Sequence, residues 1–314
     1  MKLISIVTGC YNEEENVQEL YKRVKAVFAP LTQYRYEHIF IDNNSSDKTV
    51  EILKQLAIHD KNVKIIVNTR NFGHVRSPSY ALLQAKGDAV ISLVADLQDP
   101  PEMILDLIHN WEAGFKIVVG VKVKTQQTFI MSAVRRFYYH LVAKISNVQL
   151  IRNFTGFGLY DQQVIKALRQ IDDPYPYFRG LICEIGYPIK TVPYEQPARK
   201  RGFTKNNFYT LYDMAILGIT NHSKIPIRLA TLGGFVLSAF SFTTSIIFLF
   251  LKLIFWHHFN TGIAPILIGL FFFSSVQLFF ICILGEYVAS ILTQVQKRPL
   301  VFVKERVNFD NEES

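Results

Sequence analysis

Short apolar runs alternate with helical patterns over the first third of the chain. Runs rich in β-branched residues predict strands, and apolar side chains at every third or fourth position predict helices. The predicted strands are Ile4–Thr8, His38–Ile41, Val63–Val67 and Ala89–Val94, and the predicted helices are Val17–Phe28, Thr49–Ala57, Ser77–Ala85 and Glu102–Ala113. Strands that alternate with helices indicate an α/β domain with a mostly parallel sheet, whose ligand crevice lies at the carboxyl ends of its strands.

Two long uncharged runs follow much later in the chain. Leu229–Leu251 has 23 residues and Phe259–Gly285 has 27, and a membrane-spanning helix needs about 20. We therefore expect a soluble domain at 1–225, two spans at about 229–251 and 262–285 within 226–290, and a tail at 291–314. Because Glu286 lies only at the edge of the second run, a channel or pump is disfavoured and the spans are interpreted as an anchor.

Charge is distributed unevenly along the 314 residues. The net charge of +8 divides into −3 over residues 1–113, +11 over 114–228 and 0 over 229–314. A basic excess directly before the first span favours anionic membrane lipids as a partner over nucleic acid. Basic residues flank the outer ends of both spans, at Lys224, Arg228, Lys297, Arg298, Lys304 and Arg306. The positive-inside rule then predicts an integral membrane protein with the soluble domain and both termini in the cytoplasm.

The basic middle segment contains amphipathic patterns. Apolar side chains recur on one helical face within about 127–146, and a second candidate helix covers about 208–222. Such helices can lie in the membrane interface, and the alternative is packing against the domain core. The three cysteines are widely spaced, without CxxC or His pairing, which predicts reduced thiols rather than disulfides. Glu13–Glu15 stand where a cleavage site would follow the N-terminal apolar run, so a secretory signal peptide is not expected.

The sharpest chemical feature follows the last predicted strand of the first third. Asp96 and Gln98 come directly after Ala89–Val94 and are two residues apart. Carboxylate and amide oxygens suit a hard cation such as Mg²⁺ or Mn²⁺, which can bridge a diphosphate. The alternative is an acidic turn in contact with solvent.

Several motifs together resemble family 2 glycosyltransferases, and more closely the polyprenyl-phosphate glycosyltransferase group, which includes dolichyl-phosphate mannose synthase and bactoprenol glucosyltransferase. In the first third they are 10–16 (CYNEEEN), 41–49 (IDNNSSDKT), 69–73 (TRNFG) and 95–102 (ADLQDPPE). Later motifs are 178–181 (FRGL), 192–194 (VPY), 202–205 (GFTK), 218–220 (GIT), 226–229 (PIRL), 284–287 (LGEY) and 297–299 (KRP). The resemblance covers about residues 3–304.

The resemblance implies a GT-A nucleotide-diphosphosugar fold with two C-terminal membrane helices. It also implies inverting transfer of one sugar from a nucleotide donor to a lipid monophosphate in a bacterial plasma membrane. The implied nucleotide-sugar contacts are Thr8, Tyr11, Glu13, Asp42, Arg70 and Asp96, with Asp96 and Gln98 on a Mg²⁺ or Mn²⁺ cofactor. Alternatives are core packing for Tyr11, a turn role for Asp42 and a surface ion pair for Arg70.

Three positions depart from the family pattern. Val94 stands where an aspartate precedes Asp96 by two residues, and Asp42-Asn43-Asn44-Ser45 replaces the common Asp-Asp-Gly-Ser. Gly156 stands where relatives have a proposed catalytic aspartate. Glu184 is then the candidate base, with a structural role as the alternative.

A phosphate acceptor reduces the need for a base. A hydroxyl must lose its proton during transfer, whereas a phosphate monoester with a second pKa near ~6 is already largely dianionic at neutral pH. The chain offers cations for the acceptor phosphate or the donor diphosphate at Arg135, Arg136, Arg179, Arg201 and Lys205. The expected partners are a nucleotide sugar, UDP-linked in preference to GDP-linked, and undecaprenyl or a similar polyprenyl phosphate. The alternatives are transfer to a lipid or glycan hydroxyl and a catalytically silent membrane scaffold. The sequence leaves the oligomeric state open, and a homo-oligomer is compatible with it.

Overall fold

The structure is a computed structural model that describes residues 1–123, 151, 153–197, 225–254 and 263–309. Its strands are β1 (Lys2–Cys10), β2 (Tyr34–Asp42), β3 (Val63–Asn68), β4 (Ala89–Val94), β5 (Ile117–Lys122), β6 (Phe154–Asp161), β7 (Ile189–Tyr194) and β8 (Val303–Val307). Its helices are α1 (Val17–Phe28), α2 (Thr49–His59), α3 (Gly73–Gln84), the 3₁₀ turn η1 (Pro101–Met103), α4 (Ile104–Glu112), α6 (Gln162–Ile171), α7 (Phe178–Glu184), α9 (Ile225–Ile254) and α10 (Ile263–Gln296). The predicted amphipathic helices at 127–146 and 208–222 lie outside the described residues.

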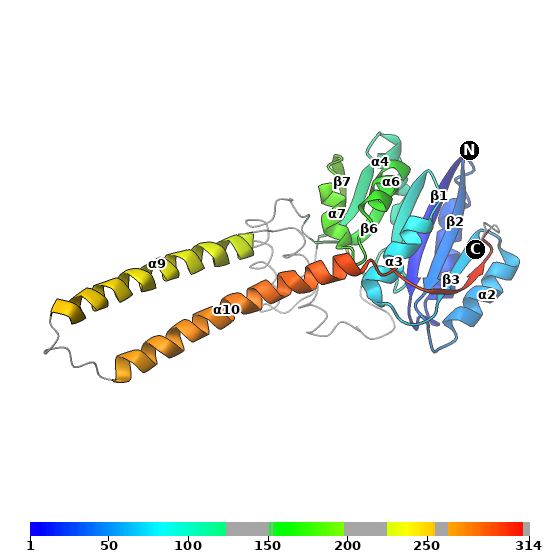
Figure 1. Ribbon diagram of the computed structural model, residues 1–314. Coiled ribbons are helices and arrows are strands. Elements are labelled where there is room, and N and C mark those ends of the chain that lie inside the picture. The colour runs from blue at the N-terminus through cyan, green and yellow to red at the C-terminus, as the bar shows by residue number, and fades with distance from the viewer. Residues whose placement is uncertain (124–150, 152, 198–224, 255–262, 310–314) are drawn as a thin grey trace.

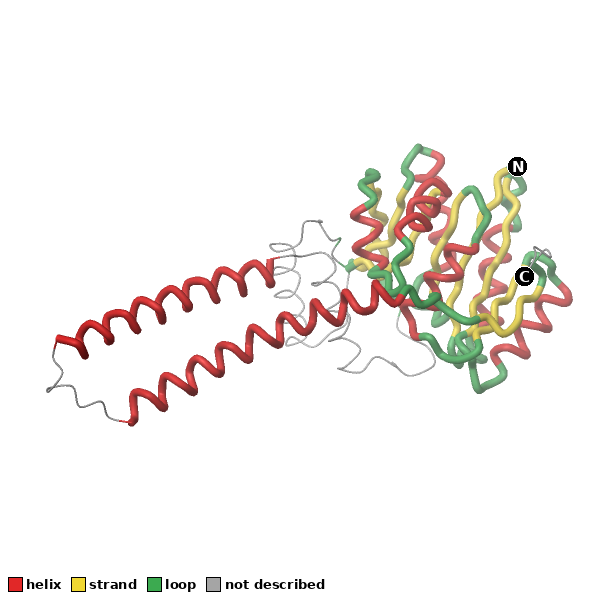
Figure 2. The backbone as a smooth tube through the Cα atoms, in the orientation of Figure 1, coloured by secondary structure: helices red, strands yellow, loops and turns green. Residues whose placement is uncertain are grey.

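One eight-stranded sheet in the order β7-β5-β6-β4-β1-β2-β3-β8 forms the centre of the domain from which α9 and α10 extend (Figure 1). β1 pairs in parallel with both β2 and β4, and β2 pairs in parallel with β3. β6 and β8 run antiparallel to their neighbours. The predicted α/β class and the mostly parallel sheet are therefore confirmed, and Figure 2 shows the helices against the strands.

Apolar residues fill both faces of the central strands. In β1, Ile4 and Ile6 belong to one buried cluster, and Val7 belongs to the other. Because successive side chains in a strand point to opposite faces, a strand covered on both sides needs a nearly continuous apolar run. This explains why the short runs in the sequence predict strands although they do not alternate with polar residues.

The start of α3 differs from its prediction. The sequence pattern predicts a helix from Ser77, whereas α3 begins at Gly73 and contains Pro78. A proline is tolerated in the first turn of a helix, but further inside it removes a backbone hydrogen bond. The pattern therefore suggests a start just before Pro78. The first turn of α3 is instead determined by side chains from the neighbouring loops, described below.

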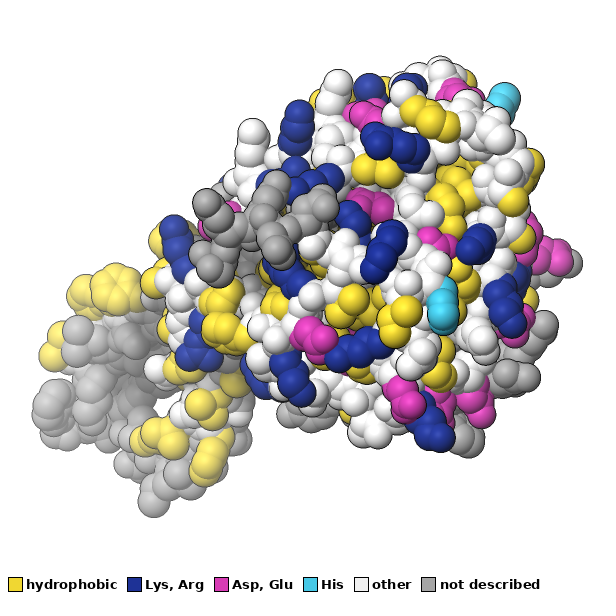
Figure 3. All heavy atoms as spheres, turned by 90° about the vertical axis from the view of Figure 1, so that its right-hand side faces the viewer, with side chains coloured by type: hydrophobic (Ala, Val, Ile, Leu, Met, Phe, Trp, Pro, Cys, Tyr) yellow, Lys and Arg dark blue, Asp and Glu magenta, His cyan; other side chains and the backbone are white. Residues whose placement is uncertain are grey.

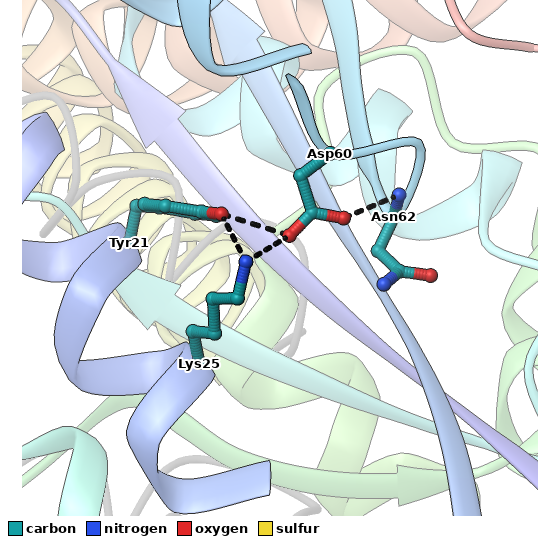
Figure 4. Close-up of polar contacts among 4 residues, drawn as sticks. All are labelled: Tyr21, Lys25, Asp60 and Asn62. Carbon is teal, nitrogen blue, oxygen red and sulfur yellow. Dashed lines mark hydrogen bonds and ion pairs between the residues drawn. The ribbon is translucent and has the colours of Figure 1, made fainter. Parts of the chain in front are cut away.

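Polar contacts close the sheet edge at which β3 begins. Figure 4 shows Asp60 between α1 and this edge: the Tyr21 hydroxyl donates to Asp60 Oδ2 at 2.8 Å, Lys25 Nζ lies 3.1 Å from the same oxygen, and the Asn62 amide donates to Oδ1 at 3.0 Å. Burial opposes ionisation, but these donors together lower the pKa of Asp60. The carboxylate thus joins α1 to the turn between α2 and β3.

Two long helices extend away from the sheet domain (Figure 1). Windows at Ile227–Thr244 in α9 and Gly269–Gln296 in α10 are long and apolar enough to cross a membrane, and none of their residues is buried. Both helices are longer than the uncharged runs. The helix α9 has 30 residues, and α10 has 34 because it continues to Gln296. The chain then returns to the sheet, where residues 303–307, expected as part of a tail, form β8 antiparallel to β3.

The surface of the sheet domain carries both signs of charge. On the face seen in Figure 3, Lys and Arg side chains are interspersed with Asp and Glu side chains over the coloured part of the surface. Two ion pairs at the surface, Arg23–Glu102 at 2.6 Å and Lys54–Glu305 at 2.7 Å, join segments that are distant in sequence. The second pair attaches β8 to α2.

Candidate active site

The carboxyl ends of three parallel strands meet at one edge of the sheet. The register pairs Cys10 of β1 with Asp42 of β2, and Gly9 of β1 with Val94 of β4. The loops that leave these strands therefore start side by side. They carry Tyr11 and Glu13, the 43–48 turn, and the Asp96–Asp99 segment, while Arg70 follows the end of β3.

The β1 and β2 loops hold each other in place. The Asn12 amide donates to Ser45 Oγ at 2.9 Å, and the Ser46 amide donates to Asn12 Oδ1 at 2.8 Å. Asn12 and Asn44 both have positive φ, +54° and +63°, a conformation that asparagine tolerates better than most residues. The amide of Glu13 donates to Thr49 Oγ1 at 2.8 Å, so this loop is also tied to the start of α2.

Asp42 builds the turn after β2. Its side chain is fully buried and accepts from the Ser45 amide at 2.9 Å and from the Ser45 hydroxyl. Burial raises the pKa of Asp42, and the hydrogen bonds from Ser45 oppose this rise. The turn role considered for Asp42 is therefore present in the structure, and its contact with a nucleotide stays a prediction.

Asn43 connects the β2 end to the loop after β3. Its Nδ2 donates to Asn71 Oδ1 at 2.8 Å and to the Gly73 carbonyl at 3.2 Å. Its Oδ1 accepts from the Phe72 amide at 2.9 Å and from Asn68 Nδ2 at 3.2 Å. Asn71 Oδ1 also accepts from the Gly73 amide at 2.8 Å, so this amide network, centred on the buried Asn43, sets the first turn of α3.

The loop after β4 presents the predicted metal ligands. Asp96 Oδ1 accepts from the Gln98 amide at 3.2 Å across Leu97, whose φ is +58°. Asp96 and Gln98 are partly buried, and Val94 is 43% exposed at the strand end. Among the described residues, no group of three His, Cys, Asp or Glu side chains is arranged as a metal site. One carboxylate and one amide oxygen still fit Mg²⁺ or Mn²⁺, since Mg²⁺ usually takes one or two carboxylates and completes its shell with substrate phosphates and water.

Asp99 fixes the buried end of this loop. It is 2% exposed and accepts a short hydrogen bond from the Tyr194 hydroxyl at the end of β7. Burial raises the pKa of Asp99 to about 6, although the Tyr194 hydrogen bond and the charge of Lys122 oppose the rise. The Asp99–Tyr194 contact joins the Asp96 loop to the other half of the sheet, and no feature of the sequence pattern pointed to it.

Two cations approach the same region, one from the loop after β3 and one from α7. Arg70 is exposed, and its Cζ lies 4.1 Å from the centre of the Phe72 ring. Arg179 Nη1 donates to the Phe154 carbonyl at 3.4 Å, at the start of β6. Burial lowers the pKa of His74 in the first turn of α3, and the charge of Arg179 lowers it further.

The remaining predicted site residues lie elsewhere or outside the description. Thr8 is fully buried, and its hydroxyl lies 2.9 Å from His38 Nε2 inside the sheet. Glu184 is exposed at the last position of α7. The cations Arg135, Arg136, Arg201 and Lys205 lie outside the described residues. Nucleotide contact by Thr8 and a base role for Glu184 stay predictions.

Gly156 has a backbone reason to be glycine. Its φ is +105°, a conformation that residues with a side chain rarely adopt. Its carbonyl accepts from the Tyr160 hydroxyl at 2.8 Å. An aspartate at position 156 would be strained in this conformation, so the site is built without a carboxylate there.

One cavity between described residues lies apart from this edge. This cavity of about 130 Å³ is enclosed by α3, α6, the start of α7 and residues 297–300. Its lining includes Leu82, Leu168, Phe178 and Arg298, and it includes none of the predicted site residues. The candidate active site is therefore the open strand edge.

A family model described as glycosyl transferase family 2 matches residues 5–169, from β1 into α6. The chain belongs to glycosyl transferase family 2. This confirms the resemblance drawn from the sequence motifs and, with the sheet order, the GT-A fold.

Curated family 2 relatives are similar along nearly the whole chain. "Uncharacterized glycosyltransferase YkcC" from Bacillus subtilis is 32% identical over 98% of this chain and 95% of its own length. "SfII prophage-derived bactoprenol glucosyl transferase" from Shigella flexneri is 32% identical over 96% of this chain and 97% of its own. The crystal structure of mannosyl-3-phosphoglycerate synthase from Rubrobacter xylanophilus is 14% identical, covers 74% of this chain and 75% of that chain, and has a TM-score of 0.47.

The Asn43 network predicts a specific cost for restoring the family's usual aspartate. In Asn43→Asp the two amide donors are lost, and a carboxylate faces Asn71 Oδ1 and the Gly73 carbonyl. We expect a loss of roughly 2–4 kcal/mol, seen as an apparent Tm lower by roughly 5–15 °C. The measurement is the fraction of monodisperse protein in detergent after heating.

Asn44→Asp is the matched control. Asn44 is exposed in the adjacent position, and its left-handed backbone (φ +63°) is one that aspartate also tolerates. Its apparent Tm should stay within about 2 °C of wild type. Equal losses in the two variants would contradict a role of the Asn43 amide.

Asp99 predicts a pH-dependent difference in stability. The protonated, buried carboxyl contributes stability that is full below its unfolded pKa of 3.8 and is lost as the pH rises through about 6. Asp99→Asn removes this loss and retains an acceptor for Tyr194. The apparent Tm of Asp99→Asn relative to wild type should therefore rise by roughly 5 °C between about pH 4.5 and about pH 7.5. Asp106→Asn, an exposed control on α4, should show no such trend, and a flat difference for Asp99→Asn would disprove the assignment.

Proposed function

We propose that this family 2 enzyme transfers one hexose or N-acetylhexosamine from a UDP-sugar to undecaprenyl phosphate or a similar polyprenyl phosphate. The similarity to a bactoprenol glucosyl transferase along 96% of this chain, both long helices included, carries the proposal of acceptor. The donor half rests on the strand edge, where Asp42, Arg70 and Asp96 lie on adjacent loops. UDP is proposed in preference to GDP.

The reaction is a single displacement. An oxygen of the lipid phosphate attacks the anomeric carbon, and the bond from that carbon to the donor diphosphate oxygen breaks. The nucleoside diphosphate leaves with the electron pair, and the configuration at the anomeric carbon inverts. No proton has to be removed from the acceptor, because its phosphate is already ionised at neutral pH.

Asp96 and Gln98 would hold a divalent cation against the donor diphosphate. When bound, the cation supplies positive charge that stabilises the leaving nucleoside diphosphate. Arg70 would add a guanidinium to the same anion, since charged hydrogen bonds to phosphate are strong and directional. Val94 contributes no ligand, so the donor phosphates and water would complete the coordination shell.

The two apolar helices would place the domain at the depth of its acceptor. We propose that α9 and α10 span the bacterial plasma membrane and that the sheet domain and both termini are cytoplasmic, as the flanking Lys and Arg residues indicate. Anionic headgroups would attract the basic 114–228 segment, with Arg135 and Arg136 near the acceptor phosphate. Holding the domain beside a substrate confined to two dimensions raises its effective concentration.

Loss of the Asp96 carboxylate should abolish transfer. Purified full-length protein with UDP-glucose, other nucleotide sugars, Mg²⁺ or Mn²⁺ and undecaprenyl phosphate should form a lipid-linked sugar, and Asp96→Ala should reduce the rate by roughly 100-fold or more. Asp106→Ala, an exposed carboxylate on α4, should keep the wild-type rate. A rate for Asp96→Ala within a few-fold of wild type would remove the metal assignment. A protein that binds neither nucleotide sugar nor metal would instead be a silent scaffold.

The chemistry of the acceptor predicts the effect of Glu184→Gln. A phosphate acceptor needs no general base, so this variant should retain its rate within about threefold. For a hydroxyl acceptor the same change should abolish transfer. Competition between undecaprenyl phosphate and undecaprenol in one assay, run with the wild-type protein and with Glu184→Gln, distinguishes the two acceptor classes.

A further inference from the structure

The loop Thr69–Gly73, which carries Arg70, is held between two distant parts of the chain. On one side it receives the Asn43 amide network described above. On the other side lies the segment Pro299–Phe302, which we call the strap because it connects α10 to β8. Figure 1 shows the chain after α10 passing α3 on its way to the strand beside β3. The Thr69 amide donates to the Phe302 carbonyl at 2.9 Å, so the strap contacts the loop directly.

The Phe72 ring is the centre of this contact. It is 6% exposed, and the Arg70 guanidinium carbon lies 4.1 Å from its centre. The Phe302 ring centre lies 6.1 Å from that of Phe72, with the planes inclined by 48°. A cation over an aromatic face and a tilted aromatic pair are both attractive. Arg70 therefore rests on a ring that Phe302 supports.

A second arginine reinforces the strap. Arg76 of α3 donates to the Pro299 carbonyl at 2.6 Å, and its guanidinium carbon lies 5.4 Å from the centre of the Phe72 ring. Burial lowers the pKa of Arg76, and the nearby charge of Arg70 lowers it further. Both cations thus adjoin one ring.

The charge of Arg70 is not neutralised within the described part of the chain. Its hydrogen bond there is from Nη1 to the Asn71 carbonyl at 3.2 Å, and none of the ion pairs among described residues includes it. Like charges close together favour the binding of an anion between or beside them. A guanidinium held in one orientation at the strand edge suits a diphosphate.

We propose that Phe302 is a positioning residue for the nucleotide donor. It supports Phe72, and Phe72 orients Arg70 toward the donor diphosphate. This inference rests on the proposed function, which places Arg70 at the donor. Two residues separate the strap from α10, so the Thr69–Gly73 loop is attached to the end of a helix that is long and apolar enough to cross a membrane.

The test is a double-mutant cycle on UDP binding. Isothermal titration of the full-length protein in detergent with UDP and Mn²⁺ should show binding weakened roughly 10–100-fold in Arg70→Ala and roughly tenfold in Phe302→Ala. The double variant should bind no more weakly than Arg70→Ala, since Phe302 acts through Arg70. Phe302→Tyr, which retains the ring, should restore affinity to within about twofold of wild type.

Glu305→Gln is the matched control on β8. It weakens the ion pair with Lys54 without touching the Thr69–Gly73 loop, and UDP affinity should be unchanged. In the transfer assay Phe302→Ala should raise the KM for the UDP-sugar while kcat stays within about threefold. A loss of stability alone would lower the amount of active protein and leave KM unchanged.

The outcomes separate this inference from the function on which it rests. Wild-type affinity in Phe302→Ala, or additive losses in the double variant, would overturn the positioning role and leave the proposed function intact. If wild-type protein binds neither UDP nor GDP, the donor assignment fails and the positioning role fails with it. Phe302 is 57% exposed, so its truncation leaves the buried core unchanged.

Discussion

Parallel pairing of β1 with both of its neighbours is the constraint on which the site depends. In parallel strands all carboxyl ends lie at the same edge, and the register places Asp42 beside Cys10 and Val94 beside Gly9. Loops that are more than 30 residues apart in sequence are therefore adjacent from their first residue. Each loop then has to satisfy its own buried backbone groups, and Ser45, Asn12 and Asn43 do so across loop boundaries.

Local hydrogen bonding and backbone geometry account for two of the departures from the family pattern, Asn43 and Gly156. Asn43 carries both donors and an acceptor, and all of them are used, whereas an aspartate would offer only acceptors. Gly156 takes a backbone conformation that disfavours any side chain. Val94 leaves Asp96 as the one carboxylate of the pair expected at the proposed metal position. Each change is compatible with an acceptor that arrives already ionised and with a donor that brings its own phosphate ligands.

The link between the sheet and the long helices is more extensive than an anchor requires. After α10 the chain crosses the start of α3, contacts the Phe72 ring and adds β8 to the sheet beside β3. The Lys54–Glu305 ion pair and the Arg306 hydrogen bonds to Tyr80 and Gln84 hold this return in place. The Thr69–Gly73 loop and the end of α10 therefore belong to one packed unit, which orients the strand edge relative to the helices.

Local patterns in the sequence were sufficient for most of the fold. The apolar period of Val17–Phe28 predicted both ends of α1, and the run Ala89–Val94 predicted β4 with its bounds, because burial of a face selects the same residues that form the element. Motifs identified family 2, and charge distribution with the uncharged runs predicted the two long helices. The start of α3 could not be predicted, because it is set by Asn43, which lies 30 residues earlier in the chain. The same holds for Asp99 with Tyr194 and for Phe72 with Phe302: each residue is an ordinary loop or strand-end residue by itself. Their roles arise only where tertiary packing buries a polar or aromatic group and requires a partner from elsewhere in the chain.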